Sequence, residues 1–461
     1  MKTPLLLLLA LLTLGVGRPA DPPATPPNVL LIVADDLGGV DLGCYGNPFF
    51  ETPNLDRFAR SALRFTQAYA AAPVCSPSRT SMLTGRDPAR VGLTNFIIGK
   101  RTDLASPVLP APFLDHLPLS EITLAEEFKR DGYATALVGK WHLGENTQPA
   151  RSNPDLQGFD YVTDFDFGLR PRGVSYDWYQ EGDTLRAYRL PELNERITNH
   201  ALDYLRKPHE KPFFMMLTHY APHLPLQAAA EKEAKYRRKP NPKPGEFNPL
   251  YGAMVEELDD HVGRVLAELE RSGLARNTVV IFVSDNGGVA VDEAGEKQPT
   301  TNAPFRAGKG LLYEGGVRIP LLVRWPGRTQ PGVTDALVTT TDLFPTLLDL
   351  ARGKPTAFDR PIDGRSFRPV LEGKKAPARG AVFWHYPHFS NQGGRPSAAV
   401  RRGNDKLILS LEDDSAQLFN LKTDPGETTD LAAREPKKAE ELKALLKNWQ
   451  RSVNANMPIR K

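Results

Sequence analysis

Apolar residues in the first three quarters of this chain are gathered into short continuous runs. The four longest runs are residues 28–34, 134–139, 213–218 and 278–284. Runs of this length and composition predict strands that are buried on both faces of a mostly parallel sheet. A shorter run at 320–324 is expected near the edge of the same sheet.

Helical periodicity occurs between these runs. It is visible in residues 123–130 and is clearest in residues 251–271, where apolar side chains recur at helical spacing and Gly273 can end the helix. Strands that alternate with helices predict an α/β domain, which we assign to residues 28–375.

From about residue 376 the pattern changes to shorter runs separated by turns. Strands are expected at 381–384, 398–401, 406–411 and 417–420, followed by a helix at 436–450. We therefore expect a smaller C-terminal α+β subdomain, residues 376–461, in which an antiparallel sheet and one helix pack on the main domain.

The N-terminal segment predicts export. Lys2 precedes an apolar run from Leu5 to Val16, which is shorter than the roughly 20 residues that a membrane helix needs. Together with a Pro-rich leader at 21–27, this run predicts a cleaved signal peptide, residues 1–20, and a periplasmic or secreted protein without a stable membrane anchor. An uncleaved anchor is the alternative.

The formal net charge argues against a nucleic-acid partner. It is +3 for the whole chain and falls to +1 when Lys2 and Arg18 leave with the signal peptide. A nucleic-acid binder would be expected to carry a clustered basic surface.

Polar residues follow each of the four long strands directly. They are Asp35 and Asp36, then Lys140 and His142, then His219 and His223, and finally Asp285 and Asn286. Because the carboxyl ends of parallel strands meet at one edge of a sheet, these side chains are expected to share a crevice. Aspartate and asparagine oxygens suit Ca²⁺ or Mg²⁺, and the lysines and histidines would surround a charged oxyanion.

Two other motifs are excluded at this edge. Residues 303–310 (APFRAGKG) are similar to a phosphate loop, but Ala303 and Gly310 replace its first glycine and its Ser/Thr. His219 and His223 have the spacing of a zinc pair, but Pro222 excludes a helix interior and no glutamate lies between them. We therefore expect no zinc site and interpret His219 as a packing residue.

The stretch VCSPSRTSMLTGR, residues 74–86, contains one of only two cysteines and is expected to form a short polar loop. Cys75 has three interpretations: a disulfide with Cys44, a thiol nucleophile, or a precursor that is converted into another group. A thiolate is a poor ligand beside a hard cation, whereas the hydrate of an aldehyde offers two hydroxyl groups. This argument favours the precursor.

The segments CSPSR (75–79) and LTGR (83–86) resemble the signature of the type I, formylglycine-dependent sulfatases, in which the cysteine is converted to formylglycine. The resemblance is arylsulfatase-like and continues in order along nearly the whole mature chain. Its further blocks are DD (35–36), GKWHLG (139–144), APH (221–223), DNGG (285–288), GKG (308–310), YEGG (313–316), LFNL (418–421) and DPGE (424–427).

The resemblance implies a fold, a reaction and a metal. The fold is an alkaline-phosphatase-like, mostly parallel sheet sandwiched by helices, and the reaction is hydrolysis of sulfate monoesters. The metal is one Ca²⁺, with Mg²⁺ as the second choice. Its implied ligands are Asp35, Asp36, Cys75 as formylglycine, Asp285 and Asn286.

The resemblance also implies catalytic roles, and a formylglycine-generating maturation enzyme as a partner. Arg79 would stabilise the aldehyde hydrate, and Lys140 and Lys309 would neutralise charge on the sulfate oxygens. His223 would protonate the departing alcohol, and His142 would assist release of sulfate from residue 75.

Two alternatives to a sulfatase remain. One is a phosphonate or phosphodiester hydrolase of the same superfamily, and the other is a non-catalytic binder of sulfated glycans. The second is disfavoured because every expected catalytic position is filled.

The expected substrate is a sulfated carbohydrate, attacked from a chain end, with aryl sulfate esters hydrolysed slowly. Residues 383–389 (FWHYPHF) combine aromatic rings with imidazoles, and His385 and His388 are predicted to bind sugar hydroxyls beside the sulfate. The alternative is that this segment is a buried strand edge.

Overall fold

The computed structural model describes residues 26–97, 99, 101–144, 153–163, 178–181, 184–187, 190–243 and 245–461. The predicted signal peptide, residues 1–20, and most of the Pro-rich leader lie outside these ranges. Within them, no helix combines the length and the apolar character needed to cross a membrane.

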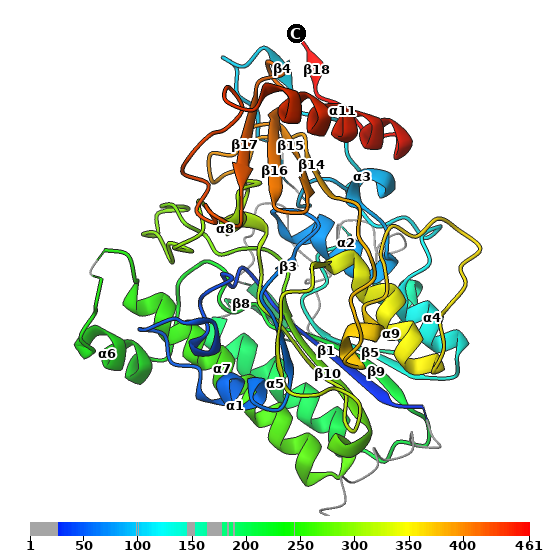
Figure 1. Ribbon diagram of the computed structural model, residues 1–461. Helices are drawn as coiled ribbons and strands as arrows, with labels where there is room; N and C mark the ends of the chain where they lie inside the picture. Colours follow the sequence, from blue (N-terminus) through cyan, green and yellow to red (C-terminus); the bar gives the residue numbers. More distant parts are fainter. Residues whose placement is uncertain are drawn as a thin grey trace, which may run out of the picture.

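An eight-stranded mixed sheet lies at the centre of the described residues (Figure 1). Its strands follow the order β12 (Gly332–Thr334), β2 (Leu63–Phe65), β11 (Leu321–Arg324), β10 (Thr278–Ser284), β1 (Asn28–Ala34), β9 (Phe213–Thr218), β5 (Ala134–Gly139) and β6 (Tyr161–Thr163). The four long predicted strands are β10, β1, β9 and β5, which are neighbours and pair in parallel with the predicted bounds. The fifth, β11, is antiparallel and is not at the edge, because the three-residue strands β2 and β12 lie outside it.

Alternate residues of β1 explain why helices cover both faces of the sheet. Val29, Leu31 and Val33 belong to a core that includes residues of α4 (Leu124–Arg130) and α9 (Leu343–Arg352). Leu30 and Ile32 belong to the opposite core, formed with α1 (Pro53–Ala59), α5 (Leu190–Arg206) and α7 (Pro249–Arg271). Figure 1 shows these two helical layers on either side of the strands. The predicted mostly parallel sheet sandwiched by helices is therefore confirmed.

A second, antiparallel sheet carries the C-terminal region. It consists of β14 (Val382–Tyr386), β15 (Ser397–Arg402), β16 (Asp405–Ser410) and β17 (Ala416–Asn420). One face packs on α11 (Pro436–Ser452), and the other packs on main-domain residues such as Tyr69 and Val74. The predicted antiparallel sheet plus helix is therefore present, whereas the boundary placed at residue 376 stays a prediction.

Shorter elements connect these layers. The helical ones are η1 (Gly43–Tyr45), α2 (Cys75–Thr84), α3 (Pro88–Val91), η3 (Pro154–Gln157), α6 (Ala230–Arg238), η4 (Leu274–Asn277), α8 (Glu314–Val317), η5 (Thr340–Asp342) and α10 (Arg368–Leu371). The remaining strands are β3 (Ala68–Tyr69), β4 (Val108–Leu109), β7 (Trp178–Glu181), β8 (Thr184–Ala187), β13 (Val338–Thr339) and β18 (Ile459–Arg460).

Candidate active site

The carboxyl ends of the central strands meet as the sequence predicts. Asp35 and Asp36 directly follow β1, and the backbone N–H of Asp36 donates to Asp285 Oδ1, 3.2 Å away beyond β10. Gly139, the last residue of β5, has φ = 99°, and a Cβ there would lie 2.0 Å from the Thr218 carbonyl oxygen. A glycine is therefore required for β5 to end beside β9 and deliver Lys140 to the same edge.

Cys75 is the first residue of α2, so the predicted polar loop is wrong at this point. Its Sγ lies 4.0 Å from Asp36 Oδ1, and its side chain is buried. No disulfide joins it to Cys44. Arg79 follows one turn later on the same face of the helix, which brings both residues to the strand ends.

The helix α2 is buried along its whole length although most of its residues are polar. Its hydroxyl groups bond to the helix backbone: Thr80 Oγ1 donates to the Ser76 carbonyl at 3.0 Å, and Thr84 Oγ1 donates to the Thr80 carbonyl at 2.8 Å. Such bonds satisfy short polar side chains without solvent. This is why a polar segment can pass through the core and position Cys75.

Three buried cations neutralise the three carboxylates. Lys140 Nζ lies 2.5 Å from Asp35 Oδ2, and Lys309 Nζ lies 2.7 Å from Asp36 Oδ2. Arg79 contacts Asp285 Oδ2 through Nε and one terminal nitrogen, both at 2.9 Å.

The chain holds Lys309 in place through its backbone. Its N–H donates to the Gly288 carbonyl at 3.0 Å, and the N–H of Gly310 donates to the Pro73 carbonyl at 2.8 Å. Lys309 is thereby fixed between the loop after β10 and the segment that leads into Cys75.

The oxygen set fits a divalent cation. One carboxylate oxygen each of Asp35 and Asp36 lies within 4.8 Å of the other, of Cys75 Sγ and of one ring nitrogen of His223. Asp35 Oδ1 and Asn286 Oδ1 are buried and accept no hydrogen bond from the described residues. Buried oxygens without a donor are destabilising unless another group binds them, and carboxylate and amide oxygens are ligands that Ca²⁺ and Mg²⁺ prefer.

Burial and neighbouring charge shift the titration of the acidic and thiol groups. Burial raises the pKa of Asp285 to about 7, and the nearby Asp35 carboxylate adds to the shift. Burial acts to raise the pKa of Asp35 as well, but the charges of Lys140, His223 and Arg79 hold it well below its usual value. Burial also raises the pKa of the Cys75 thiol despite two nearby lysines, which argues against a thiolate nucleophile.

The two predicted catalytic histidines, His142 and His223, lie beside the carboxylates and lysines at the strand ends. His223 Nδ1 is 2.6 Å from the Leu224 carbonyl oxygen, which can only accept, so Nδ1 carries the proton. Its Nε2 faces Lys309 Nζ at 3.2 Å and Asp36 Oδ2 at 3.5 Å. Burial and the charge of Lys309 lower the pKa of His223, and burial and the charge of Lys140 lower that of His142.

Asp36 and His142 share an uncommon backbone conformation. Their φ angles are 63° and 58°, in the left-handed region that non-glycine residues rarely adopt. Such strain persists where the surrounding structure enforces it, and it is concentrated at functional sites.

A cavity of about 150 Å³ opens onto Cys75. Five of the six predicted catalytic residues line it, and so do several residues that the sequence does not single out. The cavity is lined by Cys75, Phe96, Lys140, His142, Leu193, Tyr220, His223, Leu224, Pro225, Glu293, Lys309, Asn391 and Gln392. The loop residues among them carry no periodic pattern, so only the folded chain identifies them.

His385 and His388 do not line this cavity, which corrects their predicted position beside the sulfate. His385 Nε2 lies 2.8 Å from the Asn456 carbonyl oxygen, and His388 Nε2 lies 2.8 Å from Thr94 Oγ1. Both rings are buried, so the structure gives them packing roles, the alternative that the sequence left open. His219 also packs, with its ring stacked on that of His261 at 5.5 Å.

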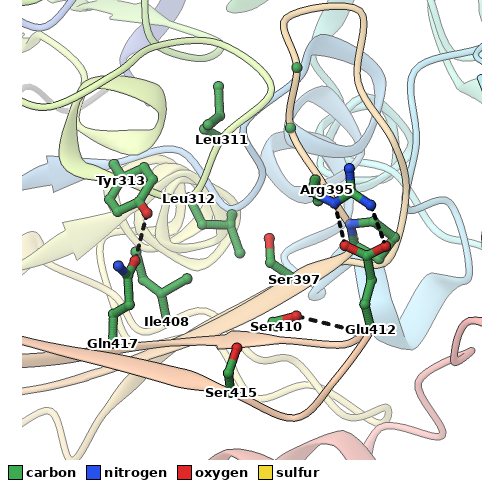
Figure 2. A pocket seen from close by; sticks show the side chains of 13 residues that line it. Leu311, Leu312, Tyr313, Arg395, Ser397, Ile408, Ser410, Glu412, Ser415 and Gln417 are labelled. Atoms are coloured by element: carbon green, nitrogen blue, oxygen red, sulfur yellow. Dashed lines mark hydrogen bonds and ion pairs between the residues drawn. The ribbon is translucent and has the colours of Figure 1, made fainter. Parts of the chain in front are cut away.

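A separate pocket of about 370 Å³ lies between the C-terminal sheet and residues 311–313 (Figure 2). An ion pair between Arg395 and Glu412 borders it on one side, and the Tyr313 hydroxyl donates to Gln417 Oε1 at 2.6 Å on the other. None of the predicted site residues lines this pocket.

Comparison with known proteins agrees with this geometry. The family model Sulfatase matches residues 27–354, and the model for the C-terminal region of N-sulphoglucosamine sulphohydrolase matches residues 307–455. The N-acetylgalactosamine-6-sulfatase of Mus musculus is 36% identical over 443 residues, 92% of this chain and 79% of the relative. The steryl-sulfatase of Mus musculus is 33% identical over an alignment of 530 positions, which covers 93% of this chain and 82% of the relative.

A solved structure extends the likeness to three dimensions. Ps i-CgsB in complex with k-i-k-neocarrahexaose has a TM-score of 0.75 and 27% identity, over 92% of this chain and 93% of that chain. The chain belongs to the sulfatase family. It is accordingly an enzyme that hydrolyses sulfate esters.

Proposed function

We propose that this sulfatase removes sulfate from a sulfated carbohydrate, using a formylglycine made from Cys75 and a single bound Ca²⁺. The observation that carries the proposal is the position of Cys75 Sγ, 4.0 Å from Asp36 Oδ1, in a cavity that Lys140 and Lys309 also line. A nucleophile, a cluster of metal-binding oxygens and two cations for an anionic ester therefore lie together.

The metal would be held by Asp35, Asp36, Asp285, Asn286 and residue 75. Calcium is the first choice because the protein ligands are oxygens and a large, flexible shell suits it, and magnesium is the second. When bound, the cation lowers the pKa of a hydroxyl on residue 75 and so makes that group a better nucleophile.

Residue 75 must be modified to fill this role. An oxidising maturation enzyme would replace the Cys75 thiol with an aldehyde oxygen. The hydrated aldehyde supplies two hydroxyl groups, one to attack sulfur and one to expel sulfate afterwards. The high pKa of the buried thiol supports this interpretation over direct attack by sulfur.

The cations would bind and orient the ester. Lys140 and Lys309 line the cavity, where they can hydrogen-bond the sulfate oxygens and stabilise the charge that increases there in the transition state. Arg79 bonds to Asp285 and to the Lys140 carbonyl, so it would keep the metal ligand and the lysine backbone in position beside residue 75.

The histidines would move protons. His223 Nε2 is the nitrogen left to act, because Nδ1 is bonded to the Leu224 carbonyl. An anionic ester that enters beside Lys309 offsets the charge that lowers the pKa of His223, which favours the protonated ring that the leaving alcohol needs. His142 would take the proton from the second hydroxyl of residue 75 when sulfate is expelled.

The carbohydrate substrate is supported by the relatives and by the cavity. One relative is named an N-acetylgalactosamine-6-sulfatase, and one structural neighbour was solved with neocarrahexaose. A cavity of about 150 Å³ encloses little more than one six-membered ring, which favours attack at a chain end. We further propose that the enzyme is exported, on the evidence of its N-terminal sequence.

The proposal is tested on protein made in a host that has a formylglycine-generating enzyme. Mass spectrometry should show the Cys75 peptide with sulfur replaced by oxygen, metal analysis should find one Ca²⁺ per chain, and sulfate should be released from sulfated mono- and oligosaccharides. Full activity after exhaustive chelation, stoichiometric zinc, or faster turnover of a phosphodiester than of any sulfate ester would contradict it.

A further inference from the structure

The cavity beside Cys75 differs in charge between its inner end and its mouth. Lys140 and His142 line the inner end and are buried, whereas Glu293 and Asn391 are more exposed and therefore lie toward solvent. A carboxylate at the entrance is unexpected in a site that must admit an anion, because it repels a sulfate ester as the ester approaches. The residue therefore needs an explanation.

Glu293 is held in a fixed position by its surroundings. Its backbone exchanges two hydrogen bonds with Glu296, at 3.1 and 2.9 Å, which close a tight turn. Gln392 Nε2 donates to Glu293 Oε2 at 2.6 Å. The Gln392 side chain is buried against Gly310, where a Cβ would lie 2.5 Å from its Oε1.

These contacts connect Glu293 to the catalytic group. Gly310 directly follows Lys309, so Gln392 links the loop that carries Lys309 to the loop that carries Glu293. Among the described residues, no donor is hydrogen-bonded to the second carboxylate oxygen, Glu293 Oε1. One oxygen of a fixed carboxylate is thus available to a ligand in the cavity.

We propose that Glu293 determines which sulfate esters are accepted, an inference that rests on the proposed function. It admits a ring that is uncharged beside the scissile sulfate and offers a hydroxyl or amide N–H to Oε1. It disfavours a ring that carries a second sulfate or a carboxylate there. Because the cavity encloses about one ring, such a second anion lies close enough to Glu293 for the two negative charges to repel each other.

The test uses two aryl sulfates that differ in one charge, 3-carbamoylphenyl sulfate and 3-carboxyphenyl sulfate. The ratio of their kcat/KM values is measured by sulfate release for the matured wild type, for Glu293→Gln and for Glu296→Gln. The Glu293→Gln side chain can still accept from Gln392, and Glu296 is a carboxylate of the same turn that does not line the cavity. Differences in intrinsic reactivity between the two esters cancel when ratios are compared between enzymes.

We expect the preference for the carbamoyl ester to fall about tenfold in Glu293→Gln, equivalent to about 1.4 kcal/mol, and to stay unchanged in Glu296→Gln. An unchanged ratio in Glu293→Gln, or an equal change in both variants, would overturn the assignment of Glu293 while leaving the sulfatase mechanism intact. If the wild type released no sulfate from either ester or from any sulfated mono- or oligosaccharide, the proposed function would fail, and this inference with it.

Discussion

Two buried clusters in this molecule are both built from carboxylates and cationic side chains. They differ in how many of their buried oxygens have a bonding partner. At the carboxyl edge of the large sheet, Lys140, Lys309 and Arg79 face three aspartates. At the junction with the C-terminal sheet, Lys406 Nζ lies 2.9 Å from both Glu314 Oε1 and Glu427 Oε1.

The second cluster is complete. Glu314 Oε2 accepts from the Tyr69 hydroxyl at 2.6 Å, and Glu427 Oε2 accepts from the backbone N–H of Glu314 at 2.6 Å. Three of the four carboxylate oxygens have a hydrogen-bond donor, and the fourth, Glu427 Oε1, has no hydrogen bond among the described residues but is paired with the Lys406 ammonium at 2.9 Å. None of these residues lines the cavity at Cys75. The cluster joins the two sheets and needs no ligand.

The first cluster is incomplete. Asp35 Oδ1 has only a 3.9 Å contact with Arg79, and Asn286 Oδ1 accepts no hydrogen bond among the described residues. Because burial of unpaired polar atoms is unfavourable, this difference indicates that the oxygens of the first cluster are suited to a further ligand, whereas the charges of the second cluster are already paired. Charge and burial alone do not make the distinction.

The largest expected effect comes from the nucleophile and is measured against the other cysteine. Cys75→Ser should reduce sulfate release at least about a thousandfold, because loss of a nucleophile removes most catalysis. A serine hydroxyl can accept the sulfuryl group but has no second hydroxyl to expel it. Cys44 is half-buried and does not line the cavity at Cys75, so Cys44→Ser is the matched control and should keep the wild-type rate.

Initial rates of sulfate release and thermal unfolding midpoints check this prediction. Both variants should unfold near the wild-type temperature, since each replaces one small side chain by another. Retention of a tenth of the activity by Cys75→Ser would contradict the assignment of residue 75.

A pair of lysine substitutions separates the two clusters. Lys406→Met leaves Glu314 and Glu427 buried without their cation, which should lower the free energy of unfolding by about 3–5 kcal/mol. Lys309→Met removes a cation that faces the cavity, so it should lower kcat by about a hundredfold or more. Each variant is the control for the other.

Urea unfolding and kcat on the same sulfated sugar distinguish these effects. The folded fraction of Lys406→Met should turn over at close to the wild-type rate. If Lys309→Met proved as unstable as Lys406→Met with kcat unchanged, the functional distinction between the clusters would be wrong.

The sequence predicts most of the large sheet because its central strands are buried on both faces. Continuous apolar runs such as residues 28–34 therefore end where the strands end. The predicted helix 251–271 begins two residues late, because its cap, Asn248, lies ahead of the apolar repeat and accepts from two backbone N–H groups. The helix α2 has no apolar repeat from which it could be predicted. It can still be buried, because Ser and Thr side chains in it bond to its own backbone.

The site residues also fall into those that the sequence predicts and those that it does not. Residues at strand ends and in short motifs, such as Asp35 and Lys140, are predictable because position in the sheet fixes their location. Glu293 and Gln392 come from loops about a hundred positions apart, and nothing in either loop predicts that they meet. His385 lies in an alternating aromatic segment that suits a ligand site and a buried strand equally, and only its contacts decide between them.

The smallest expected effect concerns the histidines that pack away from the cavity. Burial lowers the pKa of His385 to about 4, that of His261 to about 4 and that of His388 to about 3. Above an unfolded pKa of about 6.5 these rings are neutral in both states, and their contribution to stability is fully present. As the pH falls below that value the unfolded chain takes up protons first, so each ring lowers stability by up to about 1.4 kcal/mol per pH unit until its folded pKa is reached.

Replacing one of these rings should therefore flatten the decline of stability in acid. In His385→Gln the unfolding midpoint should fall less steeply between pH 6.5 and pH 5 than in the wild type, although loss of the bond to Asn456 lowers it at neutral pH. Equal slopes for the two proteins would mean that His385 is not held neutral by burial, and its packing role would then need another explanation.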